Sequence, residues 1–307
     1  MLEEIARNKR RSVIVIGAFV LVWAGIGALL GALFSGSSSS PAGGIVTGVA
    51  VAALVAVACA AFAYSSGSGL VLAVSGARPA DPDQYRQLHN VVEAMAISAG
   101  IPKPTVYVIE DPSPNAFATG VSPNRAAITA TTGLLEIMNR EELEGVISHE
   151  MSHIKNYDVR LILIVTTLIG FAALVASMLW RSALFMRPRG RDAGQVVILV
   201  YATAAVLTVV AFFVGPLIQF ALSRSREELA DVSGVNLTRN PVGLMHALQK
   251  LQANDKPFAG FNHATAAMCI DDPLQHHEAW FHRLFDTHPP LDERIAILEK
   301  ISFGQPA

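Results

Sequence analysis

Four long runs of apolar residues set the strongest constraint on how this 307-residue chain can fold. They cover residues 13–34, 45–64, 161–180 and 196–221, and none of them contains a charged residue. A helix of about 20 residues crosses the roughly 30 Å hydrocarbon core of a bilayer, where charged side chains are expensive. The runs therefore predict an integral membrane protein with about four transmembrane helices.

The rest of the composition excludes other classes. The two cysteines, Cys59 and Cys269, cannot build a disulfide framework. The net charge is −2 and there is no basic block, which argues against a nucleic-acid partner. The first apolar run follows a basic start and resembles a signal peptide, but it is too long for one and a second run follows soon after. We interpret it as a retained membrane anchor.

The flanking charges predict an orientation. The short, uncharged linker 35–44 favours a tight hairpin between the first two runs, and more Lys and Arg residues lie near the run ends on the side of the N-terminus, which places that side inside the cell. Four arginines between the third and fourth runs oppose this, unless those runs do not fully cross: Arg181, Arg187, Arg189 and Arg191. We expect a two-span anchor over 1–64 and a second domain over 65–307, interrupted by a hydrophobic hairpin at 161–221.

Between the second and third runs the pattern becomes mixed. Residues 82–99 have apolar side chains at helical spacing, whereas 105–109 and 126–130 read as short strands. Asn139, with Glu142 three residues later, forms a capping-box pattern that opens another helix. The C-terminal part predicts further helices. The expected fold is α+β, mostly helical with a small β-sheet.

The helix that follows Asn139 carries the segment His149-Glu150-Met151-Ser152-His153, an H-E-x-x-H pattern. Residues four apart lie on one face of a helix, so both imidazoles can face a single cation. Glu150 lies about 100° around the helix from His149, where a general base for a metal-activated water belongs. An amphipathic helix with two half-exposed histidines is the plainer alternative. The pattern predicts a catalytic metal site.

A third metal ligand must come from elsewhere, since catalytic zinc usually takes three protein ligands. Glu227 and Asp231 lie four residues apart after the fourth apolar run and face one way, whereas Glu228 points about 100° off and is a weaker candidate. One carboxylate on the metal and a second one orienting an imidazole N–H is a common arrangement. The alternative is a solvated acidic helix start that pairs with Arg224 and Arg226.

The spacing along the chain also predicts the depth of the site. His153 precedes the third run by eight residues, and Glu227 follows the fourth by six. At 1.5 Å per residue these are about 12 Å and 9 Å from the membrane boundary. The two runs would thus form a hairpin that returns both ligand helices to one depth, close to the cytosolic surface.

Other polar residues are weaker candidates. His288 and Arg294 could stabilise an oxyanion, although a lone histidine in a turn and an exposed helix arginine are more often structural. Three further histidines form a local cluster that a polar surface explains better than a second metal: His276, His277 and His282.

Together these segments resemble the HtpX-type membrane zinc metalloproteases, which are more distantly related to the CaaX prenyl proteases. The resemblance covers nearly the whole chain, including the two-span start. It is carried by short motifs in a fixed order: NAFATG at 115–120, TTGLL at 131–135, HEMSHIKNYD at 149–158, SRSREELAD at 223–231 and THPPL at 287–291.

The resemblance implies a zincin-like metalloprotease domain that binds one zinc ion per subunit. It makes His149, His153 and Glu227 the zinc ligands and Glu150 the catalytic base. Glu228 departs from the family pattern, in which the position after the third ligand is usually aromatic, and the acidic segment 270–273 is also unexpected. Both departures concern substrate preference more than catalysis.

The resemblance assigns roles to residues around the zinc as well. Asp231 would be a partner of a ligand histidine, Arg294 would lie close to the site, and His288 would take part in catalysis there. An edge segment would align the substrate, formed by Asn115, Ala116, Phe117, Ala118 and Thr119.

The implied activity is that of a multi-pass endopeptidase of the bacterial inner membrane, with its catalytic site on the cytoplasmic side. Its substrates would be unfolded or damaged membrane proteins in the lipid bilayer, in stress-related quality control, and it could cooperate with other quality-control proteases. No nucleic acid is expected.

Three alternatives stay open. The chain could be a processing protease of narrow specificity, acting on a defined lipidated or tail-anchored substrate. It could be a zinc-binding membrane adaptor without activity, although a structural site has no need of Glu150. It could also be a small transporter, which the absence of charged residues within the apolar runs disfavours.

Overall fold

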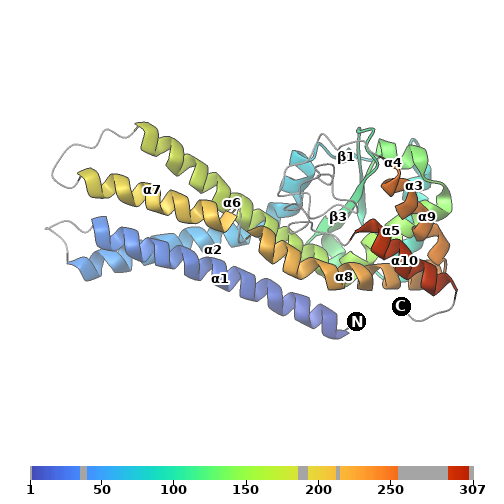
Figure 1. Cartoon of the computed structure of the whole chain (residues 1–307), viewed down its shortest axis with the longest axis horizontal. Helices are drawn as coiled ribbons and strands as arrows, with labels where there is room; N and C mark the ends of the chain where they lie inside the picture. The colour runs from blue at the N-terminus through green and yellow to red at the C-terminus, as the bar shows by residue number, and fades with distance from the viewer. Residues whose placement is uncertain (1, 35–39, 186–192, 212–214, 255–289, 304–307) are drawn as a thin grey trace. The chain divides into compact units, whose positions relative to one another are not determined.

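The computed structural model of the chain describes residues 2–34, 40–185, 193–211, 215–254 and 290–303. Figure 1 shows their helices and strands. Contacts divide the chain into two compact units. The first, which we call the sheet unit, comprises residues 1–9, 67–163 and 217–307, and the second, the helical unit, comprises 10–66 and 164–216. The prediction of an anchor over 1–64 and a domain over 65–307 stays a prediction.

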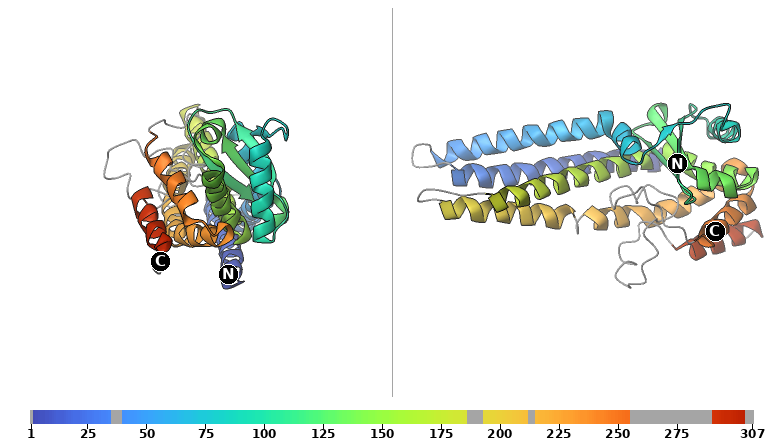
Figure 2. Two further views of the ribbon diagram at one scale, coloured as in Figure 1. Left: turned by 90° about the vertical axis from the view of Figure 1, so that its right-hand side faces the viewer. Right: turned by 90° about the horizontal axis from the view of Figure 1, so that it is seen from above.

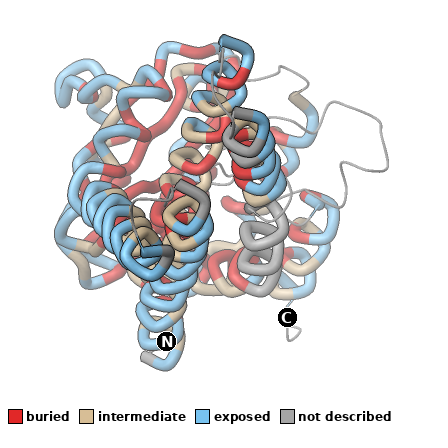
Figure 3. The backbone as a smooth tube through the Cα atoms, turned by 90° about the vertical axis from the view of Figure 1, so that its left-hand side faces the viewer, coloured by how far each residue is buried: buried red, intermediate tan, exposed pale blue. Residues whose placement is uncertain are grey.

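The helical unit contains the larger part of each of four helices, which run side by side in Figures 1 and 2: α1 (Leu2–Phe34), α2 (Pro41–Val74), α6 (Asp158–Phe185) and α7 (Ala193–Val209). Among the described residues, α1, α2 and α6 have the length and apolar composition to cross a membrane. Large apolar side chains on them face outward, as Leu21 does with 74% of its surface exposed. Such faces suit contact with lipid, and Figure 3 shows the exposed positions along the helix that leads from the N-terminus.

The fourth predicted span, 196–221, is described only in part, because residues 212–214 lie outside the described residues. Its described part is divided between α7 and the beginning of α8 (Gly215–Thr238). Among the described residues, three of the four predicted spans form helices long enough to cross.

Glycines allow the first two helices of the helical unit to touch. A Cβ atom on Gly48 of α2 would lie 2.0 Å from the carbonyl oxygen of Gly27 of α1, so no larger residue fits. Small residues at helix crossings are typical of membrane proteins, where close backbone approach provides the packing energy. Deeper in the same unit, Trp23 packs on Phe171 of α6, with ring centroids 5.3 Å apart.

The sheet unit contains a four-stranded mixed sheet in the order β1-β2-β4-β3. Its strands are β1 (Arg78–Pro79), β2 (Thr105–Ile109), β3 (Ala116–Gly120) and β4 (Ala126–Thr131). β2 and β4 are parallel, whereas β1 pairs with β2 and β3 with β4 in antiparallel fashion. The motif at 115–120 thus supplies an edge strand.

Helices α3 (Arg86–Ala99) and α5 (Arg140–Lys155) pack on one face of this sheet, and α4 (Thr132–Ile137) follows β4 directly. Helices α8 and α9 (Pro241–Gln252) pack on α5, and α10 (Leu291–Ser302) packs on α9. The predicted capping box is present at the start of α5, where Asn139 accepts from the backbone N–H of Glu142, whose side chain accepts from that of Asn139. The largest buried cluster joins α3, α5 and α9 to the strands. The predicted fold, mostly helical with a small sheet, is confirmed.

Candidate metal centre

Helix α5 presents two histidines to one point. His149 and His153 lie one turn apart, and their Nε2 atoms are 3.1 Å from each other. The two rings are nearly perpendicular, at 88°, and both residues are buried. The convergence of the two Nε2 atoms follows from the four-residue spacing on one helical face.

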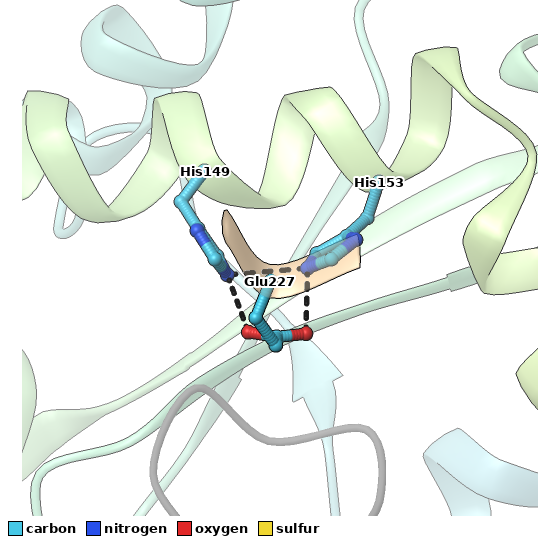
Figure 4. A group of neighbouring side chains, drawn as sticks. All are labelled: His149, His153 and Glu227. Carbon is cyan, nitrogen blue, oxygen red and sulfur yellow. Dashed lines mark hydrogen bonds and ion pairs between the residues drawn. The ribbon is translucent and has the colours of Figure 1, made fainter. Parts of the chain in front are cut away.

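Glu227 of α8 faces both histidines, as Figure 4 shows. Its Oε2 lies 3.4 Å from Nε2 of His149, and its Oε1 lies 3.4 Å from Nε2 of His153. The ligand atoms of the three residues all lie within 4.8 Å of one another, and the carboxylate is only 2% exposed. The structure therefore brings together the three residues that the sequence analysis proposed as metal ligands.

A glycine on α8 allows this approach. A Cβ atom on Gly234 would lie 3.0 Å from Oγ of Ser148 and 3.1 Å from the backbone nitrogen of His149. A larger residue would require α8 to move away from α5 by a few tenths of an ångström. The fit of α8 against α5 thus helps to place Glu227 opposite the histidines.

The three side chains fit a divalent metal ion. Two imidazole nitrogens and one carboxylate are the protein ligands of many catalytic zinc sites, in which a further position stays open for water or substrate. The buried carboxylate of Glu227 also needs a compensating positive charge, which a bound cation would supply.

The first histidine is oriented by a buried carboxylate. Nδ1 of His149 lies 2.8 Å from Oδ1 of Asp231, one turn beyond Glu227 on α8. Arg294 of α10 donates to both oxygens of Asp231, at 2.8 and 2.9 Å, and also lies 3.7 Å from Oε2 of Glu227. Asp231 and Arg294 thus lie next to the ligands, as expected. Arg294 is fully buried, not exposed as its helix position alone suggested.

A second carboxylate, which the sequence analysis missed, orients the other histidine. Nδ1 of His153 lies 3.1 Å from Oδ2 of Asp158, the first residue of α6. Asp158 follows His153 by five residues in the same motif, so its nearness in sequence was an available signal. Each ligand histidine therefore presents Nε2 to the cluster and Nδ1 to its own carboxylate, an arrangement that fixes the tautomer a metal needs.

Comparison with known proteins gives the family. The model of peptidase family M48 matches residues 82–302. The protein described as Protease HtpX homolog of Streptococcus gordonii is 40% identical, over 98% of this chain and all of the relative. The chain belongs to peptidase family M48. The relative of the same description from Leuconostoc citreum is 43% identical, over 97% of this chain and 99% of its own length.

A solved structure shares the fold. The crystal structure of S. mikatae Ste24p matches with a TM-score of 0.50 and 17% identity, covering 97% of this chain and 67% of that one. Family membership and the candidate spans together make the protein a membrane-associated metalloprotease, and the family implies a metal cofactor.

The protonation of the M48 cluster shows how strongly it attracts positive charge. Burial lowers the pKa of His149, as does Arg294, but Asp231 and Glu227 outweigh both and the pKa is raised. Burial also lowers the pKa of His153, but Glu227 and Asp158 raise it to about 10. Burial raises the pKa of Asp231, while Arg294 and His149 bring it below its ordinary value. The surrounding carboxylates therefore favour positive charge on both ligand histidines.

The remaining predicted residues of this M48 protease have mixed outcomes. Glu150 is buried beside His149 on α5. Burial lowers the pKa of Arg294, but Asp231, Glu227 and, least of the three, Glu150 raise it, so Glu150 lies in the electrostatic surroundings of the cluster. Its role as the base stays a prediction. His288, like the histidine cluster at 276–282, lies outside the described residues.

The predicted substrate edge lies beside the metal helix. Ala116 and Ala118 of β3 share one buried cluster with Val146, Ile147 and Met151 of α5. The other members of the predicted edge are buried as well: Asn115, Phe117 and Thr119. Substrate alignment by this edge stays a prediction.

Proposed function

We propose that this M48 protease is a zinc-dependent endopeptidase that hydrolyses peptide bonds of misfolded or damaged membrane proteins. The observation that carries the proposal is the convergence of His149, His153 and Glu227 within 4.8 Å, in a chain whose family is proteolytic. The zinc identity rests on the two-imidazole, one-carboxylate donor set, which suits that ion in hydrolytic sites.

The chemistry divides between the ion and Glu150. Zinc, when bound, supplies a Lewis acid that polarises a peptide carbonyl and lowers the pKa of a water molecule. The Glu150 carboxylate takes a proton from the attacking water and passes it to the nitrogen of the leaving amine. Asp231 and Asp158 accept from Nδ1 of the two ligand histidines and hold the rings in place.

Substrate binding would use the edge strand β3. The sheet order leaves β3 without a second neighbouring strand among the described residues. An extended peptide that adds beside such an edge is held through its backbone, which makes binding tolerant of sequence. Broad specificity of this kind suits a protease that removes unfolded chains.

We further propose that the site faces the cytoplasm at the bacterial inner membrane. The basic residues before the first span favour an inside N-terminus. His153 lies five residues before Asp158, with which α6 begins, and α6 is a candidate span. Only unfolded segments near the bilayer would then reach the site. Cooperation with other quality-control proteases belongs to the same proposal.

Casein degradation by purified, metal-stripped protein with and without added zinc tests the proposal. Zinc should restore cleavage, Glu150→Gln should bind zinc without cleaving, and Glu227→Ala should lose stoichiometric zinc. Zinc binding without cleavage of casein or of a membrane-tethered substrate would instead favour the adaptor. A peptide library that yields one narrow cut-site profile would favour a processing protease.

A further inference from the structure

The N-terminal helix reaches the metal site through one buried side chain. Asn8 of α1 is only 1% exposed, although its neighbours Arg7, Lys9 and Arg10 are exposed. Its Nδ2 donates to Oδ1 of Asp158 at 2.6 Å and to the backbone oxygen of Asn156 at 3.0 Å. All of these residues except Arg10 belong to the sheet unit. A buried amide that donates twice is a specific contact, because leaving such groups unpaired is costly.

Asp158 transmits this contact to a metal ligand. Its Oδ2 pairs with Nδ1 of His153 at 3.1 Å, while its Oδ1 takes the hydrogen bond from Asn8 and lies 3.6 Å from Nη1 of Arg226. The two oxygens of a carboxylate move together. A donor that fixes Oδ1 therefore also fixes the direction in which Oδ2 meets the imidazole of His153.

The next residue on α1 contacts the same turn. Tyr157, between α5 and α6, has a φ of 61°, a conformation that few residues other than glycine adopt. Nζ of Lys9 lies 4.3 Å from the centroid of the Tyr157 ring. This turn sets the distance between His153 and Asp158, and α1 contacts it at Asn156, Tyr157 and Asp158.

The two ligand histidines are supported in parallel ways. His149 is paired with Asp231, which Arg294 holds, and His153 is paired with Asp158, which Asn8 contacts. We propose that Asn8 is a positioning residue for the metal: it orients Asp158, which orients His153 and keeps its Nε2 free for the ion. The inference rests on the proposed metal function and adds the N-terminal helix to the metal site.

Zinc affinity tests this role. Asn8→Leu keeps the branching of the side chain at Cγ but removes the donor, and it should weaken zinc binding about tenfold in a chelator competition, the lower end for partners beyond the ligands. Asn8→Asp, which places a second carboxylate against Asp158, should weaken it further. Arg7→Ala, which loses only an exposed pair with Glu4 of the same helix, is the matched control and should bind zinc like the wild type.

Two further readouts separate positioning from general destabilisation. Cobalt bound in place of zinc should show altered absorption bands in Asn8→Leu and unaltered bands in Arg7→Ala, because a changed ligand geometry shifts them. In a double-mutant cycle with Asp158→Asn, the affinity losses should not add, since both act on one path.

The outcomes distinguish this inference from the proposed function. A wild type that binds neither zinc nor cobalt defeats the proposed function itself. A wild type that binds zinc while Asn8→Leu and Asn8→Asp bind it equally well defeats the role of Asn8 alone. Additive losses in the cycle also overturn it, and should Asn8→Leu fail to fold, Asn8→Asp decides the question.

Discussion

Arg294 donates two hydrogen bonds to Asp231, and neither residue is more than 1% exposed. Through Asp231 this pair reaches Nδ1 of His149, so a residue of the last helix supports a ligand on α5 that is 145 positions earlier in the chain. The pair is too deeply buried for either charge to be left without the other.

Replacing Arg294 by alanine should therefore destabilise the protein strongly. Removal of one member of a buried ion pair leaves an uncompensated charge and costs about 3–5 kcal/mol. Denaturant unfolding of the metal-stripped protein in detergent measures this. Arg294→Lys should recover part of the loss, because it keeps the charge without the planar fork. Lys300→Ala, at an exposed position of the same helix, should change stability by less than about 0.5 kcal/mol.

Stability without metal should depend on pH through His153. Its pKa in the folded protein is raised from 6.5 to about 10, so the protonated imidazole stabilises the folded state. This contribution is complete below about pH 6.5 and is lost as the pH rises towards 10. Thermal unfolding of metal-stripped protein should thus occur at lower temperature as pH rises through this window. A flat profile, or the same slope in His153→Gln, would contradict the assignment.

Glu150→Gln should separate metal binding from catalysis. Glu150 is outside the three-residue cluster, so the variant should keep one zinc ion per chain. Loss of general-base catalysis lowers rates by roughly 10²–10⁴-fold. The rate of casein cleavage should fall by a factor of this size or more. Glu141→Gln, at an exposed position of the same helix, should cleave like the wild type. Retained cleavage by Glu150→Gln would require a base elsewhere.

The close contact of α1 and α2 gives a prediction for the helical unit. Gly48→Leu must separate the helices, because its Cβ would lie 2.0 Å from the oxygen of Gly27, and overpacking typically costs about 1–3 kcal/mol. A lower unfolding temperature in detergent should result. Gly17→Leu is the control, since a Cβ there meets nothing within 4 Å. Equal effects of the two variants would show that the crossing contributes no stability.

The residues of the site differ in how well their positions could be predicted from the sequence. The spacing of His149 and His153 on one helix and of Glu227 and Asp231 on another predicted which side chains share a helix face, because helical periodicity is local. That the two helices meet was predicted from the hydrophobic hairpin between them and from the family resemblance. Asn8 has no such signal, since its partner Asp158 is 150 positions away and only tertiary packing brings them together. The same limit applies to Arg294, whose burial depends on where α10 packs.

The fold shows the same division. The three long spans and the small sheet follow from run length and β-branched segments, which are properties of neighbouring residues. The fourth run is helical where the structure describes it, in α7 and at the beginning of α8.

Gly234 offers the last test, of how closely α8 must approach α5. Gly234→Ala places a Cβ 3.0 Å from Oγ of Ser148 and 3.1 Å from the nitrogen of His149, so α8 must move by a few tenths of an ångström. Glu227 lies on the same helix and should move with it. Zinc affinity should therefore fall although no ligand is changed, by at most the roughly 10–100-fold typical of partners beyond the ligands. Chelator competition measures this. Gly170→Ala, where a Cβ meets nothing within 4 Å, should leave affinity unchanged. Unaltered zinc binding in Gly234→Ala would mean that Glu227 adjusts its side chain to compensate, and that the ligand position does not depend on this helix contact.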